Sequence, residues 1–203
     1  MKVLYLKYGL TALMMAFAVV MLYSCSNGNK KTVEENKNLK QDDRGIINGH
    51  EYVKIAGIKW ATENVGEVDS VEAIATDETY GYYYTQENAV KAVASWGGKW
   101  KLPTEEQWQK LKHECYWVFK DCCYGGKTMT GYVVTDKKDS SRFILLPSAG
   151  CYYIDGNFVY NQSGLGYYWS AEGGRYLETS YVYRTMSDDD TINGLSVRPV
   201  LME

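Results

Sequence analysis

The sequence has little histidine and no compact basic cluster. Of its 203 residues only two are histidine, His50 and His113, and neither belongs to a His-x-x-x-His pattern. We therefore expect both to be solvated surface residues. The 22 Lys and Arg residues do not form a stripe interleaved with aromatic residues, which argues against nucleic acid as a partner. No Cys-x-x-Cys pair occurs, which disfavours a structural zinc site.

The sequence also lacks an apolar run of membrane-spanning length. Lys2 and Lys7 precede an uncharged run over 8–22, which is shorter than the roughly 20 residues that a spanning helix needs. The pattern predicts a signal peptide over 1–24. Its end, Met21-Leu22-Tyr23-Ser24-Cys25, resembles a bacterial lipobox, in which Cys25 is acylated and becomes the mature N-terminus. The alternative is an ordinary signal peptide with a chance cysteine.

The lipobox reading predicts a cell-envelope lipoprotein, held at a bacterial membrane, the outer membrane in the first instance, by its acyl chains. Residues 25–49 are rich in Asn, Lys, Glu, Asp and Gly and lack periodicity, so we expect a flexible tether. Residues 50–203 are then one domain of ordinary size. Without Lys2 and Lys7 the mature chain carries 20 basic and 25 acidic residues, a net charge of −5.

The most informative stretch is 96–108, which holds paired glycines, three tryptophans and a helix start. Thr104 precedes Glu105, Glu106 and Gln107, the pattern of a capping box. We expect this helix to end near Glu114 and a strand to follow over 115–120, because that run is aromatic and β-branched.

Other elements follow from periodicity. Residues 51–61 alternate about Ala56-Gly57 and predict a β-hairpin. Thr85 can cap a helix whose inward face would be Ala89, Val90, Val93 and Ala94. Further strands are expected over 130–135, 142–146, 151–154, 157–160, 167–170, 180–184 and 195–201. Two helices followed by many short strands indicate an α+β domain.

Several motifs occur in a recognisable order: 53–64, Gly81-Tyr82-Tyr83-Tyr84, 100–108, Leu146-Pro147-Ser148-Ala149-Gly150, 166–171 and 194–200. In this order the chain resembles the Fibrobacter succinogenes major paralogous domain family, which is common in surface lipoproteins of Bacteroides-like bacteria. The resemblance implies a C-type-lectin-like fold, similar also to formylglycine-generating enzymes. In such a fold two helices pack on a central antiparallel sheet, long loops lie on one side, and the N- and C-terminal strands, here 52–55 and 196–200, lie side by side. We expect structural roles for Trp60, Trp100, Thr104, Trp108, Trp169 and Arg198.

Catalytic groups of the related enzymes are not evident. Such enzymes use reactive cysteines near the end of the domain and usually show a Trp-Glu-Trp segment there, whereas residues 152–203 contain neither. Once Cys25 is assigned to the lipid, four cysteines remain, an even number that allows three disulfide connectivities in an exported protein. They are Cys115, Cys122, Cys123 and Cys151.

A calcium-dependent sugar site is a weak candidate. The Glu-Pro-Asn, Gln-Pro-Asp and Trp-Asn-Asp motifs of sugar-binding C-type lectins are absent. Asp188, Asp189 and Asp190 could hold a hard cation through oxygen ligands, although such runs are usually only solvated. We therefore expect no cofactor, with calcium as the alternative. Arg198 is expected to pair with a carboxylate or with backbone carbonyls.

The second half of the domain is rich in tyrosine, with Gly-rich and Asn-rich loops at 153–165 and 172–178. Such surfaces stack on sugars or contact proteins. The leading hypothesis is a non-catalytic, lipid-anchored binding or adhesion module with a glycan or protein ligand. The alternatives are a calcium-dependent carbohydrate-binding lectin, a divergent formylglycine-generating-type enzyme, or a structural subunit of a surface assembly. The candidate ligand residues are Tyr153, Asp155, Asn157, Tyr160, Asn161, Arg175 and Tyr176.

Overall fold

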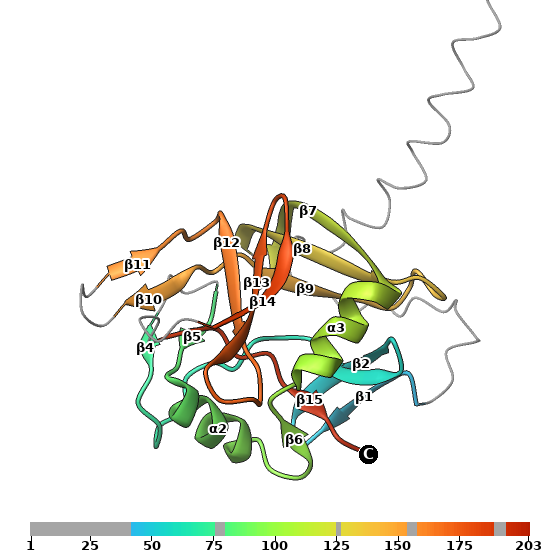
Figure 1. Ribbon diagram of the computed structural model, residues 1–203. Coiled ribbons are helices and arrows are strands. Elements are labelled where there is room, and N and C mark those ends of the chain that lie inside the picture. The colour runs from blue at the N-terminus through green and yellow to red at the C-terminus, as the bar shows by residue number, and fades with distance from the viewer. Residues whose placement is uncertain (1–41, 76–79, 125–126, 154–157, 189–193) are drawn as a thin grey trace, which may run out of the picture.

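The computed structural model describes residues 42–75, 80–124, 127–153, 158–188 and 194–203 (Figure 1). Strands far outnumber helices in these ranges, and all of the strand pairs in its sheets are antiparallel. The predicted α+β class is thus confirmed. Within the described residues no helix is both long and apolar enough to cross a membrane.

The largest sheet joins the beginning of the domain to its end. Its strands, in spatial order, are β1 (Arg44–Ile47), β2 (His50–Ile55), β3 (Ile58–Ala61), β15 (Val200–Leu201) and β6 (Trp100–Lys101). The predicted hairpin is confirmed as β2 and β3. Its turn is Ala56-Gly57, with φ of 52° and 75°, and two consecutive positive φ values suit the twist of a two-residue hairpin turn.

Two expectations about this sheet need correction. β1 lies inside the span expected to be a tether, so the folded domain begins before His50. The last strand does not pair with β2: Val200 lies opposite Trp60 of β3 on one side and Lys101 of β6 on the other. This ladder starts at Val200, directly after Pro199, whose carbonyl accepts from Ala61 N at 2.9 Å.

Both helices begin where the sequence predicts. Helix α2 (Gln86–Ser95) is capped by Thr85, and helix α3 (Glu105–Glu114) by Thr104. Gln107 N donates to Thr104 Oγ1 at 3.2 Å, and Thr104 N donates to Gln107 Oε1 at 2.9 Å, which completes the capping box. The inward face of α2 is Ala89, Ala92 and Val93, whereas Val90 and Ala94, both expected inside, are exposed.

Helix α3 ends at Glu114 and a strand follows directly, as predicted, because the aromatic and β-branched residues of that strand suit a pleated surface. The strand is longer than expected and opens a three-stranded sheet of β7 (Cys115–Tyr124), β8 (Lys127–Asp136) and β9 (Phe143–Pro147).

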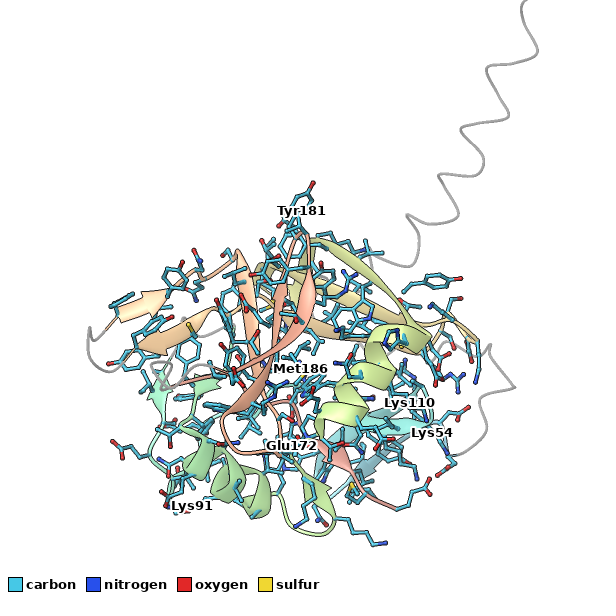
Figure 2. The ribbon with its side chains drawn as sticks, in the orientation of Figure 1. Lys54, Lys91, Lys110, Glu172, Tyr181 and Met186 are labelled. Carbon is cyan, nitrogen blue, oxygen red and sulfur yellow. The ribbon has the colours of Figure 1, made fainter. Side chains whose placement is uncertain are left out.

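The rest of the chain forms short antiparallel units. They are the pair β10 (Cys151–Tyr153) and β11 (Phe158–Tyr160), the sheet β12 (Leu165–Trp169), β13 (Arg175–Ser180) and β14 (Arg184–Asp188), and the pair β4 (Ile74–Ala75) and β5 (Tyr82–Tyr83). The strand expected over 180–184 is wrong, since residues 181–183 of this span form the turn between β13 and β14. Figure 2 shows Tyr181 of this turn pointing away from the body of the protein.

The β12–β13–β14 sheet has a different core cluster on each face. Tyr168 and Leu177 point to the cluster that contains Trp108 and Leu111 of α3. Trp169 and Tyr176, on the opposite face, join the cluster that contains the inward residues of α2. The four tryptophans expected to be structural are all buried, and the rings of Trp60 and Trp108 lie 4.7 Å apart between centroids.

Histidine and cysteine expectations are partly wrong. His113 is exposed, as expected. His50 is only partly exposed, because its ring stacks on Trp96 with centroids 3.6 Å apart and planes at 3°. Cys115 and Cys122 carry free thiols, so none of the three connectivities, each of which would pair all four cysteines, is present.

Candidate functional site

The candidate ligand residues from the 172–178 loop do not form an open surface. Tyr176 is 3% exposed and packs against Tyr167 and Trp169, with ring centroids 5.8 and 6.2 Å away. It is a core residue, which corrects the expectation that its ring faces a ligand. Arg175 is held by Glu105 at 3.1 Å and by Asp188 at 2.9 Å, so its guanidinium is already occupied.

The turn before β13 is hydrogen-bonded to the N-terminal residues of both helices. The Glu172 carboxylate accepts from Glu105 N at 2.9 Å and from the Ser170 hydroxyl. Gln86 donates to the Glu172 carbonyl at 2.8 Å and accepts from Gly174 N at 2.8 Å. Burial pushes the pKa of Glu172 up, but these hydrogen bonds outweigh burial and leave the pKa below its usual value. The carboxylate also suits the positive end of α3.

The acidic run proposed for calcium is only partly within the structure. Asp188 forms the ion pair with Arg175, while Asp189 and Asp190 lie outside the described residues. Within the described ranges no group of three or more His, Cys, Asp or Glu residues could hold a metal ion.

An exposed aromatic face lies on the β10–β11 hairpin. The register places Tyr153 opposite Phe158 and Cys151 opposite Tyr160, and residues two apart on a strand share a face. Tyr153 stacks on Phe158 with centroids 5.4 Å apart and meets Tyr160 edge-on at 5.8 Å. Phe158 and Tyr160 are 48% and 42% exposed. Tyr153 and Tyr160 were predicted from sequence, and Phe158 was missed, although its alternation with Tyr160 places both on one face.

The other candidate ligand residues in this part of the chain are Asp155, Asn157 and Asn161. Asp155 and Asn157 lie outside the described residues. Asn161 is exposed, and its backbone, with φ of 52°, forms the turn that leads to β12. Its carbonyl accepts from Gly164 N at 3.1 Å and Leu165 N at 3.0 Å. The backbone of Asn161 is therefore structural, and its side chain is open to solvent.

The base of the hairpin is fixed by close backbone contacts. Gly150 has φ of 77°, and a Cβ there would lie 2.3 Å from the Tyr160 carbonyl oxygen. Only glycine fits this close approach. Tyr152 N donates to the Gly194 carbonyl at 2.8 Å, and Gly194 N donates back at 3.0 Å. Figure 1 shows the resulting hairpin projecting from one side of the domain, with β1 and β2 on the other.

A carboxylate, Glu178, lies opposite Tyr167 in the β12–β13 strand pair. Glu178, half-buried on β13, accepts from Tyr183 Oη at 2.5 Å and from Ser187 Oγ at 3.3 Å. The hydrogen bond to Glu178 is the first cause that raises the pKa of Tyr183, burial is the next, and Tyr160 contributes also. Burial likewise raises the pKa of Tyr167, followed by Glu178, with Tyr183 and Tyr153 among the further causes. Tyr167 and Cys151 belong to one core cluster and Tyr153 packs against it, so the strand register places Glu178 near the base of the hairpin.

We call this set of Tyr153, Phe158, Tyr160, Glu178 and Tyr183 the acidic aromatic site. Its rings offer flat apolar surface for stacking, and its carboxylate offers hydrogen-bond acceptors and a negative charge. Glu178 closes the 172–178 stretch that was expected to be a loop, but it was not among the candidate ligand residues; the structure places it on β13.

The structure also has an apolar pocket. A pocket of about 310 Å³ lies between α2, β6 and the end of the chain, and its lining includes Val90, Val93, Trp100, Leu102 and Met202. Lys101 and Thr104 are the polar residues at its wall, and the Thr104 hydroxyl is engaged in the helix cap. This pocket offers little to orient a polar ligand.

No protein-family model matches the chain, and no curated protein or solved structure matches it at a significant level.

Proposed function

We propose that this protein is a non-catalytic, lipid-anchored binding module of the bacterial cell envelope, and that the acidic aromatic site contacts its ligand. The observation that carries the proposal is the pair of exposed rings, Phe158 and Tyr160, on a projecting hairpin. Binding surfaces are rich in large aromatic side chains, because these give a large contact area at a low cost in conformational entropy. A glycan or a protein segment can stack on them.

The proposal includes a C-type-lectin-like fold. It is supported by the motif order that resembles the major paralogous domain family. It is also supported by a sheet in which β15 lies beside β3, and by two helices that join different core clusters. In such an architecture loops and hairpins at one side carry the ligand, while the sheet that joins the termini holds the scaffold together.

The proposed anchor suits this arrangement. The tether would enter the domain at β1, and the β10–β11 hairpin lies on the opposite side (Figure 1). A lipid at Cys25 would thus hold the protein at the membrane with the site directed away from its attachment point. Replacing Cys25 by Ala is expected to release the protein into the soluble fraction or stall its processing. Unchanged membrane fractionation of this variant would contradict the anchor.

The binding role is tested by probing glycan and envelope-protein arrays with the wild type and with Phe158→Ala/Tyr160→Ala. Each buried interface anchor contributes on the order of 2 kcal/mol, and tenfold in affinity is about 1.4 kcal/mol. We therefore expect the double variant to lose its hits by more than about tenfold.

Tyr116→Ala/Phe143→Ala is the matched control. It removes two exposed rings, 61% and 40% accessible, from the β7–β8–β9 sheet instead, and its hits should stay unchanged. Hits retained by the hairpin variant, or lost equally by both variants, would contradict the site. Hits lost on adding a chelator would favour the calcium-dependent lectin.

A further inference from the structure

Glu178 is a half-buried carboxylate without a cationic partner among the described residues. Its two hydrogen-bond donors, the hydroxyls of Tyr183 and Ser187, are neutral. Other partly buried carboxylates here are paired: Asp43 and Asp136 lie 3.5 and 3.4 Å from Arg142. A carboxylate withdrawn from water is stabilised by an opposite charge, so Glu178 differs from the other buried and half-buried carboxylates of the described residues.

The two arginines on the same sheet are engaged elsewhere. Arg175 binds Glu105 and Asp188. Arg184 points to the other face, where its Nη1 donates to Tyr132 Oη at 3.1 Å and its guanidinium lies 5.6 Å from the Trp117 ring centroid. The Glu178 carboxylate is therefore available to pair with a cationic group of a ligand.

The lone-pair positions of the Glu178 carboxylate that remain open suit a particular kind of donor. An ionised carboxylate has about four lone-pair positions on its two oxygens. Tyr183 uses one on Oε1 and Ser187 uses one on Oε2. One position on each oxygen remains, the pattern that a planar guanidinium fork satisfies with two parallel N–H donors.

The rings beside the carboxylate favour the same group. A guanidinium stacks on aromatic faces as well as pairing with carboxylates, and it is more weakly hydrated than an ammonium. The Tyr183 ring, whose hydroxyl donates to Glu178, is 40% exposed, and the Phe158 and Tyr160 rings present further faces at the surface. This protein already holds Arg184 over the Trp117 and Tyr132 rings, with 5.6 and 5.4 Å to their centroids.

We propose that the acidic aromatic site binds an arginine side chain of a protein partner, with the guanidinium on Glu178 and its plane or stem against the hairpin rings. The inference rests on the proposed function and names the ligand chemistry of that same site. A neutral sugar could stack on the rings, but it would leave the carboxylate charge uncompensated.

The test is a titration of the full mature protein in detergent micelles, followed by aromatic side-chain NMR. The probes are blocked Gly-Arg-Gly, its isosteric citrulline analogue, and the methyl glycosides of glucose and N-acetylglucosamine. We expect saturable shifts of the Tyr153, Tyr160 and Tyr183 signals with the arginine peptide. The citrulline peptide should bind about tenfold more weakly, because it lacks the charge-assisted bonds.

Glu178→Gln is the informative variant, because the amide oxygen can still accept from Tyr183 while the charge is removed. It should weaken arginine binding about tenfold. Glu106→Gln, the same chemical change on the exposed face of α3, should leave binding unchanged. Added salt should weaken arginine binding in the wild type, since the site is partly exposed.

The outcomes separate this inference from the function on which it rests. Citrulline binding as tightly as arginine, or arginine binding unaffected in Glu178→Gln, overturns the arginine proposal. Glycoside binding at the same signals without arginine binding overturns it too, but leaves the binding module intact. If none of the probes binds at the site, and the array hits are unaffected by Phe158→Ala/Tyr160→Ala, both the arginine proposal and the proposed binding role of the site are overturned.

Discussion

Nε of Arg198 donates a hydrogen bond to Asn64 Oδ1 at 2.9 Å and so joins two residues 134 positions apart in the chain. The guanidinium also donates from Nη1 to the Ala61 carbonyl at 3.0 Å and from Nη2 to the Leu145 carbonyl at 2.8 Å. Arg198 is fully buried. Its partners are therefore one amide and two backbone carbonyls, which confirms the structural role expected for it and links the last segment of the chain to β3 and β9.

Replacing Arg198 by Met should destabilise the domain by roughly 3 kcal/mol or more, because three buried acceptors lose their donors at about 1–3 kcal/mol each. Arg198→Lys should lie between Met and the wild type, since an ammonium cannot reproduce the planar fork. Urea unfolding measures both. Arg44→Met, which removes a bond to the Ser141 carbonyl at the surface, should cost much less. Equal losses at positions 198 and 44 would contradict this role.

Thr104 and Trp108 should differ in a predictable order. Thr104→Ala removes one cap bond and should cost about 1 kcal/mol. Trp108 is fully buried, and its indole N–H donates to the Trp169 carbonyl at 3.4 Å, so Trp108→Ala should cost about 3–5 kcal/mol through the cavity that it leaves. Chemical denaturation gives both values, and the reverse order would place Trp108 outside the core.

Elements set by local chemistry were predictable. The Thr104 cap, the Ala56-Gly57 turn and the change from helix to strand after Glu114 each depend on neighbours within a few residues, where side-chain type decides the backbone. The strand partner of β15 was not predictable in this way. Choosing β3 over β2 depends on the packing of the whole sheet, and both strands carry suitable apolar residues.

The turn after β13 shows how local preference misleads. Tyr181-Val182-Tyr183 has strong strand formers, yet it is a turn. Ser180 Oγ accepts from Val182 N at 3.2 Å and from Tyr183 N at 3.1 Å, which is the geometry of a serine turn. A side-chain bond to nearby amides thus outweighed the propensity of three residues.

The site was only half predictable for a related reason. Tyr153 and Tyr176 look alike in sequence, and only the tertiary packing buries Tyr176 while leaving Tyr153 on the hairpin face. Glu178 is one acid among many until β13 brings it beside Tyr183. Loop composition indicated a binding surface but could not say which rings and which charge compose it.

Alkaline pH should destabilise the domain through Cys115 and Tyr84. Burial, and then the Asp136 and Glu114 carboxylates, raises the pKa of the Cys115 thiol from 9.0 to about 12. Burial, and then Tyr82 and Glu67, raises the pKa of Tyr84 from 10.0 to about 12. Above pH 9 the unfolded chain releases protons that the folded chain retains. The stabilisation is therefore complete below pH 9 and is lost as the pH rises towards 12.

Urea unfolding under reducing conditions from pH 7 to 11 should show this decline. For every pH unit above its pKa in the unfolded chain, each of the two groups lowers the free energy of unfolding by up to about 1.4 kcal/mol. Cys115→Ala lowers stability at pH 7 by its lost packing, but its decline between pH 9 and 10 should be shallower than that of the wild type. Parallel curves for the two proteins would mean that the buried thiol does not contribute to the pH dependence.

Gly150→Ala should distort the β10–β11 hairpin. The new Cβ would lie 2.3 Å from the Tyr160 carbonyl oxygen and 2.8 Å from Gln162 N, both backbone atoms that cannot rotate away, and the φ of 77° disfavours any side chain. Either the hairpin moves off the domain or the domain loses stability. We expect a lower melting temperature and changed NMR signals for Tyr153 and Tyr160. Gly173→Ala, where a Cβ meets nothing within 4 Å, is the matched control and should leave both unchanged.

Because the hairpin carries two of the exposed rings of the acidic aromatic site, Gly150→Ala should also weaken ligand binding without altering any side chain of that site. Full binding with a displaced hairpin would show that the rings do not contact the ligand.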